Sequence, residues 1–362
     1  LSQSESAKTL VSLDVGSQPV SISDSTFRNN QLAKGVITVD VRLFALSEHA
    51  SITLDRSHFT SNIVSGQVVE VTSSSSDTTI TLHATHSSFL DNRAIDPAQE
   101  QDPAAIRVQA PYSFGDASTA TFSDSTFSSA VVVESLQAAQ QDRMQVRLSS
   151  CTFDGSGQGE PRVMATITNV GLSMENCNIT AGRVELNGAT SSITDSLFLN
   201  KGVRSQLNGG AIAMDKGGSL HLIATTFIGC ASSGYGGAIY LTPGAGTASD
   251  SFFRAEVDTR FIDCSARFGG AIAGGGLGFA FQLDTVTFNR CQADADGGAL
   301  YLVGVLLPID QQRDLELKSI SATSNHAGGQ VGVARNVRFG SFARVWRALL
   351  HVDRAVCCSS AI

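Results

Sequence analysis

The sequence Ser-Asp-Ser-Thr-Phe occurs twice without change, at residues 23–27 and 123–127. Looser copies that end in Phe or Ile recur along most of the chain, and we call the last residue of each copy the anchor. The anchors are Phe27, Phe59, Phe89, Phe127, Phe153, Ile179, Phe198, Phe227, Phe261, Phe288 and Ile320. Neighbouring anchors are 19 to 38 residues apart. A repeat of about 30 residues is typical of solenoid proteins, in which each repeat stacks on its neighbours.

Two further elements accompany the anchors. A small polar residue follows three positions later, namely Asn30, Asn62 and Asn92 in the first half of the chain and Cys230, Cys264 and Cys291 in the second. Only the second half adds Gly-Gly-Ala-Ile or a close variant, which begins at residues 209, 236, 269 and 297. The best copies contain the pairs Gly236-Gly237, Gly269-Gly270 and Gly297-Gly298, and Gly328-Gly329 opens a degraded copy.

The residue types indicate strands and turns rather than helices. The repeats contain short alternating runs such as Ile52-Thr53-Leu54 and Thr79–His83, which are rich in β-branched residues. Gly, Asn, Asp and Ser bound these runs, as they do in strand-and-turn structures. Glycine pairs and serines are too frequent for helix interiors. The regular leucines of leucine-rich repeats are absent, and WD-type propeller repeats would need about 40 residues and four strands each.

We therefore predict an all-β fold, a right-handed single-stranded parallel β-helix of about eleven coils. The anchor side chains should point inward and stack at about 4.8 Å, the spacing of paired strands. The Asn side chains should form a hydrogen-bonded ladder, and each Gly pair should allow a corner that a Cβ atom would block. We expect the β-helix over residues 1–332. Residues 333–362 form a basic amphipathic tail, which would cap the last coil or be sequence outside the native frame.

The combination of Phe-x-x-Asn with Gly-Gly-Ala-Ile resembles the repeats of the chlamydial polymorphic outer membrane proteins. The similarity is clearest from Phe198 to Leu302, and the first half keeps the Phe anchors and the Asn residues but lacks the Gly pairs. The resemblance implies a β-helix like the passenger of an autotransporter, with an adhesin-like role at the cell surface. Two features depart from the family: Cys replaces Asn at residues 230, 264 and 291, and nothing after residue 332 resembles a membrane β-barrel.

Composition excludes several classes of protein. The chain has 362 residues, 42% hydrophobic and 16% charged, with a formal net charge of −8. This is enough apolar material for a core, and the acidic balance argues against nucleic-acid binding. No run of 18 apolar residues predicts a membrane helix. Because the chain begins at Leu1, we expect a mature product or a fragment, with any membrane tether in a region of the precursor outside it.

The cysteines and one sequon are candidate modification sites. For Cys230, Cys264 and Cys291 we favour a column of small buried residues. Disulfides between neighbouring coils remain open, whereas a metal would need a fourth ligand that the sequence does not offer. Cys151 and Cys177 precede consecutive anchors by two residues and are the better candidates for a disulfide. Asn178-Ile179-Thr180 is an N-glycosylation sequon, and Asn178 should face outward if Ile179 faces inward.

The sequence predicts no catalytic, cofactor or metal site. Polysaccharide-cleaving β-helices need acids that recur at one position of neighbouring coils. The position three residues before the anchor carries Asp24, Asp124, Asp195 and Asp258. Coils with Arg56, His86 and Ser150 at that position lie between these acids, so the acids do not adjoin and we expect no acid cluster.

Three functions remain open. The first is a non-catalytic adhesin-like passenger or extracellular scaffold, which would be attached to the outer membrane in a bacterium. The second is a carbohydrate-active β-helix enzyme, and the third is an intracellular interaction solenoid. Insertions at residues 93–118, 134–145, 243–256 and 305–314 lengthen some repeats. In solenoids such insertions gather on one face, so a protein or glycan partner should bind loops there.

Overall fold

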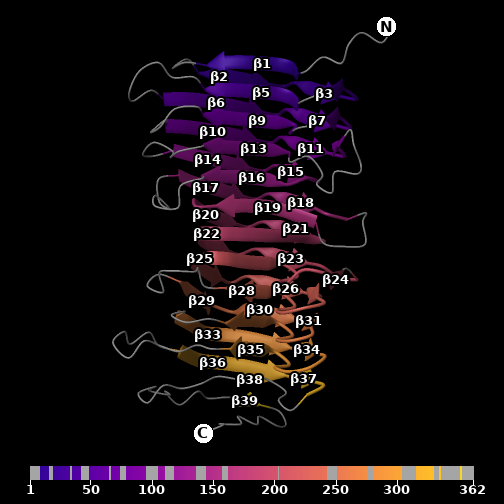
Figure 1. Ribbon diagram of the computed structural model, residues 1–362, viewed down its shortest axis with the longest axis vertical. Helices are drawn as coiled ribbons and strands as arrows, with labels where there is room; N and C mark the ends of the chain where they lie inside the picture. Colours follow the sequence, from indigo (N-terminus) through magenta and orange to yellow (C-terminus); the bar gives the residue numbers. More distant parts are fainter. Residues whose placement is uncertain are drawn as a thin grey trace. The chain divides into compact units, whose positions relative to one another are not determined.

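The computed structural model contains only β-strands among the residues that it describes (Figure 1). These are residues 9–15, 19–32, 35–41, 49–64, 67–73, 79–94, 105–110, 118–135, 144–156, 162–202, 204–242, 251–275, 280–303, 315–329, 334–335 and 351–352. The paired strands of the described residues are parallel, and successive partners come from successive repeats. The predicted all-β parallel β-helix is thereby confirmed.

The chain forms two compact units, which we describe separately. Unit 1 comprises residues 1–155 with 162–177, and unit 2 comprises residues 156–161 with 178–362. The predicted boundary at residue 332 lies outside the described residues. Within the predicted tail only residues 334–335 and 351–352 are described, and both segments are strands that pair in parallel with the repeat before them.

Most coils of unit 1 contribute three main strands. The entry strands, which precede the anchor, are β2 (Val20–Ser23), β6 (His49–Asp55), β10 (Thr79–Thr85), β14 (Ser118–Ser123), β17 (Met144–Ser149) and β20 (Gly171–Glu175). The anchor strands are β3 (Thr26–Arg28), β7 (His58–Thr60), β11 (Ser88–Leu90), β15 (Thr126–Phe127) and β18 (Thr152–Asp154). The return strands are β1 (Thr9–Val15), β5 (Gly35–Val41), β9 (Val69–Ser73), β13 (Ile106–Ala110), β16 (Val131–Ser135) and β19 (Arg162–Thr168). Corner strands β4 (Gln31–Leu32), β8 (Ile63–Val64) and β12 (Arg93–Ala94) form a separate small sheet.

Unit 2 has the same plan, but several entry strands continue without interruption into a neighbouring strand. The anchor strands are β21 (Asn178–Thr180), β23 (Leu197–Leu199), β26 (Thr226–Ile228), β30 (Thr259–Ile262) and β39 (His351–Val352). The strands that contain the entry segment, alone or continuous with a neighbouring segment, are β22 (Gly182–Thr194), β25 (Ile212–Ile223), β29 (Phe252–Glu256), β33 (Ala280–Asn289) and β36 (Leu315–Thr323). The return strands are β28 (Ile239–Leu241), β32 (Ile272–Gly275), β35 (Leu300–Val303) and β38 (Ala334–Arg335). The corner strands are β24 (Arg204–Ser205), β27 (Ala231–Ser232), β31 (Ser265–Ala266), β34 (Gln292–Ala293) and β37 (His326–Ala327).

A left-handed backbone residue marks the boundary between the entry segment and the anchor segment of each described coil. It lies three residues before the anchor, and its φ angle is between 45° and 63°. The residues are Asp24, Arg56, His86, Asp124, Ser150 and Asn176 in unit 1, and Asp195, Ala224, Asp258, Thr285 and Ser319 in unit 2. Only some of them are Asp or Asn, which tolerate this conformation best. The bend is therefore imposed by the stacking of coils as well as by local preference.

The last anchor differs from the prediction. Ile320 was expected to take the anchor position, but Phe288 pairs with Ala322 and Ile320 pairs with Val286. The left-handed residue Ser319 sits three positions before Ala322, as in the other coils. Ile320 is buried two positions before the anchor, where the inward-facing site also accepts an apolar side chain. The prediction followed the larger apolar side chain, whereas the position of the backbone bend sets the register.

The predicted insertions prove partly regular. Residues 106–110 form return strand β13, which pairs with β9 and β16. Residues 252–256 form entry strand β29, which pairs with β25 and β33. Most of the other residues assigned to insertions, including all of 305–314, lie outside the described residues.

Candidate functional site

The anchor phenylalanines stack inside each unit. In unit 1 the ring centroids of successive anchors are 4.9, 4.8, 5.3 and 5.0 Å apart from Phe27 to Phe153. In unit 2 they are 4.9, 4.9 and 5.1 Å apart from Phe198 to Phe288. All of these rings except that of Phe27 are fully buried. Apart from Phe27, the column offers no aromatic surface to a ligand, and we therefore assign it to folding.

The asparagines of unit 1 form a ladder beside the phenylalanine column. Asn62 Nδ2 donates to the Phe27 carbonyl at 3.0 Å and to Asn92 Oδ1 at 2.9 Å. Asn62 Oδ1 accepts from the backbone N–H of Asn30 at 3.1 Å and from Asn30 Nδ2 at 2.8 Å. Asn62 is fully buried, and Asn92 is nearly so. Each amide thus satisfies a backbone group that the turn would otherwise leave unpaired.

The cysteines of unit 2 occupy the same position and replace the amide as donors. Cys230, Cys264 and Cys291 are fully buried, and each thiol approaches the carbonyl of the preceding anchor at 3.6 to 3.9 Å. Burial raises the pKa of the Cys264 and Cys291 thiols well above the usual range. A buried, protonated thiol is a poor nucleophile and metal ligand. Among the described residues, no group of His, Cys, Asp or Glu could hold a metal ion.

Cys151 and Cys177, the candidates for a disulfide, are both buried free thiols in this structure. They belong to a second column, two positions before the anchors, in which Ser57, Ser87 and Ser125 donate to backbone carbonyls. The two thiols take the place of these hydroxyls and approach carbonyls at 3.3 to 3.5 Å. The hydrogen bond between the thiols, together with burial, raises the pKa of Cys151.

The Gly pairs form tight corners in unit 2. Gly236, Gly269 and Gly297 have φ angles of 64° to 70°. A Cβ atom on Gly237 would lie 2.0 Å from the Gly270 carbonyl oxygen, and one on Gly270 would lie 2.1 Å from that of Gly298. Backbones of adjacent coils therefore approach too closely for any side chain. Like the columns, these corners are structural.

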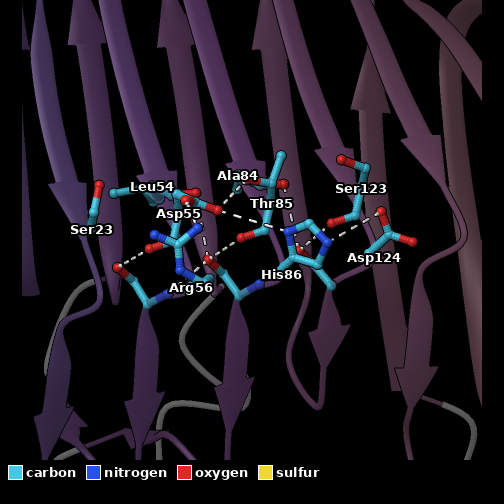
Figure 2. A network of polar contacts seen from close by, with 12 residues as sticks. Ser23, Leu54, Asp55, Arg56, Ala84, Thr85, His86, Ser123 and Asp124 are labelled. Carbon is cyan, nitrogen blue, oxygen red and sulfur yellow. Dashed lines mark hydrogen bonds and ion pairs between the residues drawn. The ribbon is translucent and has the colours of Figure 1, made fainter.

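Charged side chains do gather at the bends of unit 1. Figure 2 shows Asp55, Arg56, His86 and Asp124 side by side at the ends of the entry strands. Arg56 binds Asp24 through Nε at 2.6 Å and Nη2 at 2.9 Å, and it also contacts Asp55. His86 lies 3.8 Å from Asp55 and 3.9 Å from Asp124. Asp24 and Asp124, which lie three residues before their anchors, are kept apart as expected. Asp55, four residues before its anchor, lies between them in the row.

This charged row is exposed and internally paired. The side chains at the bend itself are 54% to 64% exposed. The hydrogen bond from Arg56 lowers the pKa of Asp24, and the positive charge of Arg56 adds to the effect. A glycosidase needs one carboxyl group with a raised pKa as general acid. The row therefore has the residue types of a catalytic site, but the pKa of Asp24 shifts in the direction opposite to the one that a general acid needs.

The outer face of unit 2 carries a shallow open depression of about 490 Å³. It is lined by Lys201, Gly202, Arg204, Gly229, Ala231, Asp263 and Ser265. The corner strands β24, β27 and β31 supply Arg204, Ala231 and Ser265 in register. The sequence did not predict a site at these residues, because they lie about one coil apart and form no recognisable motif.

Aromatic side chains form a cluster on the same coils. Tyr235 stacks on Phe268 at 4.9 Å, and Tyr301 lies 5.0 Å from Phe268. Arg267 covers the Phe268 ring at 5.3 Å, and Tyr240 lies 6.0 Å from Tyr235. Because much of each ring face is occupied by its neighbours, the cluster principally stabilises the outer surface.

The glycosylation candidate Asn178 is exposed at the start of β21, while Ile179 is buried beside it. The outward direction expected for Asn178 is thus the one observed. Among the described residues, no helix has the length and apolarity needed to cross a membrane.

Comparisons with known proteins give no relative. No family model matches the chain, and neither the curated proteins nor the solved structures contain a significant match.

Proposed function

We propose that this chain is a non-catalytic β-helix scaffold that acts outside the cell or at its surface, in the manner of an adhesin. The observation that carries the proposal is the pairing within the charged row of unit 1. Asp24, Asp55 and Asp124 each contact Arg56 or His86 on the exposed bends. Asp24 and Asp55 are thus paired with Arg56, and Asp55 and Asp124 lie beside the His86 ring, along the outside of the coils.

The interior supports the same proposal. The Asn, Ser and Cys columns direct their polar atoms to backbone groups of the stack. A stack of this kind presents a long surface whose outer side chains can vary without affecting the core. The buried thiols are compatible with an oxidising compartment, since burial keeps Cys264 and Cys291 protonated and away from solvent.

The proposal is tested by binding and by cleavage together. Beads coated with the purified chain should adhere to glycan-bearing cells more strongly than beads coated with an unrelated acidic protein. The chain should release no reducing ends from a panel of uronans and neutral polysaccharides. Failure of the coated beads to adhere above the control would contradict the adhesin-like role.

A carbohydrate-active enzyme is the second candidate, because His86 lies within 4 Å of two carboxylates, Asp55 on the preceding coil and Asp124 on the following one. If reducing ends are released, the variants Asp55→Asn and Asp124→Asn should abolish the activity. Asp195→Asn, at the same bend position in unit 2, is the matched control.

A further inference from the structure

The depression on unit 2 has the volume of a ligand site and is open to solvent. Its volume of about 490 Å³ lies within the usual range for small-ligand sites. Its floor is formed by small residues, among them Ala231 and Ser265 on adjacent corner strands. Gly229 belongs to the same wall, and a Cβ atom there would lie 2.8 Å from Lys201 Cγ. The absence of a side chain at Gly229 thus lets Lys201 lie along the depression.

The charges around the depression do not cancel. Arg290 binds Asp263 through two nitrogens, at 2.6 and 2.8 Å. Arg204 binds Asp294 at 3.0 Å and also donates to the Ser232 carbonyl at 3.2 Å.

Lys201 acts on this site at longer range. It helps to lower the pKa of Asp263, after the larger effect of Arg290. In the part of the chain that the structure describes, Lys201 has no ion pair within 4.0 Å. Three cations against two carboxylates leave a local excess of one positive charge in a chain whose formal net charge is −8.

The two arginines are held by their aspartates, and so the walls of the depression offer fixed donors next to fixed acceptors. A sugar hydroxyl both donates and accepts hydrogen bonds, and it can match such alternating groups. The uncompensated ammonium of Lys201 would favour a ligand that also carries a negative charge. An acidic peptide offers fewer hydroxyl donors for the carboxylates of Asp263 and Asp294, which would repel it.

From these features we infer that the depression binds an anionic oligosaccharide, whose carboxylate or sulfate group pairs with Lys201 while its hydroxyls contact Asp263, Arg204 and Ser265. The inference rests on the proposed function and names the ligand class of the scaffold. The ligand lies along the corner strands β24, β27 and β31, because the depression is open and spans their coils.

Calorimetric titration of the full chain tests this inference. The probes are alginate oligomers for carboxylate, dextran sulfate for sulfate and unmodified dextran as the neutral polymer. Binding of at least one anionic probe should exceed binding of dextran and should weaken as salt is added. Lys201→Gln should reduce the affinity about fivefold, the effect of one exposed ion pair. Lys216→Gln, at another exposed lysine of the same unit, should leave the affinity unchanged.

The outcomes separate the inference from the proposed function. Equal binding by Lys201→Gln and the wild type, equal binding of dextran, or no binding of any probe would overturn the inference while leaving a non-catalytic scaffold intact. Binding of a poly-glutamate peptide as tightly as alginate would overturn the glycan assignment in favour of an acidic peptide. Cleavage of alginate during the titration would instead overturn the proposed function.

Discussion

Removal of one amide from the asparagine ladder should destabilise unit 1 strongly. Asn62→Ala deletes two donated hydrogen bonds, to the Phe27 carbonyl and to Asn92, and two accepted bonds from Asn30. At about 1 kcal/mol for each bond, the loss is about 4 kcal/mol. Asn30 is only half-buried and can recover water, so we expect a loss of about 3 kcal/mol in the free energy of unfolding.

Urea unfolding followed by far-ultraviolet circular dichroism measures this loss. Asn178→Ala is the matched control, because Asn178 is an exposed asparagine in a strand, and it should change stability by less than about 0.5 kcal/mol. Asn62→Cys should lose less than Asn62→Ala, because a thiol at this position in unit 2 still donates to the preceding anchor carbonyl. If Asn62→Ala changed stability no more than Asn178→Ala, the ladder would not contribute as argued.

Three further outcomes follow from the corners, the charged row and the thiols. In urea unfolding, Gly237→Ala should destabilise the chain by at least about 2 kcal/mol, because the new Cβ atom would lie 2.0 Å from a backbone oxygen. Gly202→Ala is the control: its Cβ atom would meet no atom within 4 Å, and the positive φ angle alone should cost about 1 kcal/mol. In an NMR titration Asp24 should ionise at lower pH than a free aspartate, and Arg56→Gln should return the pKa of Asp24 to the ordinary value. Because the pKa of Asp24 is lower in the folded than in the unfolded chain, its ionised form stabilises the fold. This contribution to stability is fully present above the unfolded pKa and is lost as the pH falls through the folded pKa. Cys264 should escape alkylation by iodoacetamide in the native chain and react in urea, as read by mass spectrometry; native labelling would contradict its burial.

The sequence alone determined the repeat, its parallel strands and the parts of each coil. Phe27 and Phe59 recur because identical neighbours stack at the strand spacing, and this leaves a visible period. Asn62 and Gly237 are visible for the same reason: a ladder and a close approach of backbones each restrict the residue type at one position. The repeat period does not define the register where the anchor side chain is small, so Ile320 was predicted as the anchor in place of Ala322.

Only the tertiary structure decided which outer side chains meet. Arg56 and His86 were expected to separate acids, and they instead contact acids of neighbouring coils. Lys201 and Asp263 line one depression although about two coils of sequence lie between them. The residue type at outward positions is free to vary, because these side chains face solvent and do not stack on an identical neighbour. They therefore leave no repeat in the sequence, and their contacts depend on the stacking of coils.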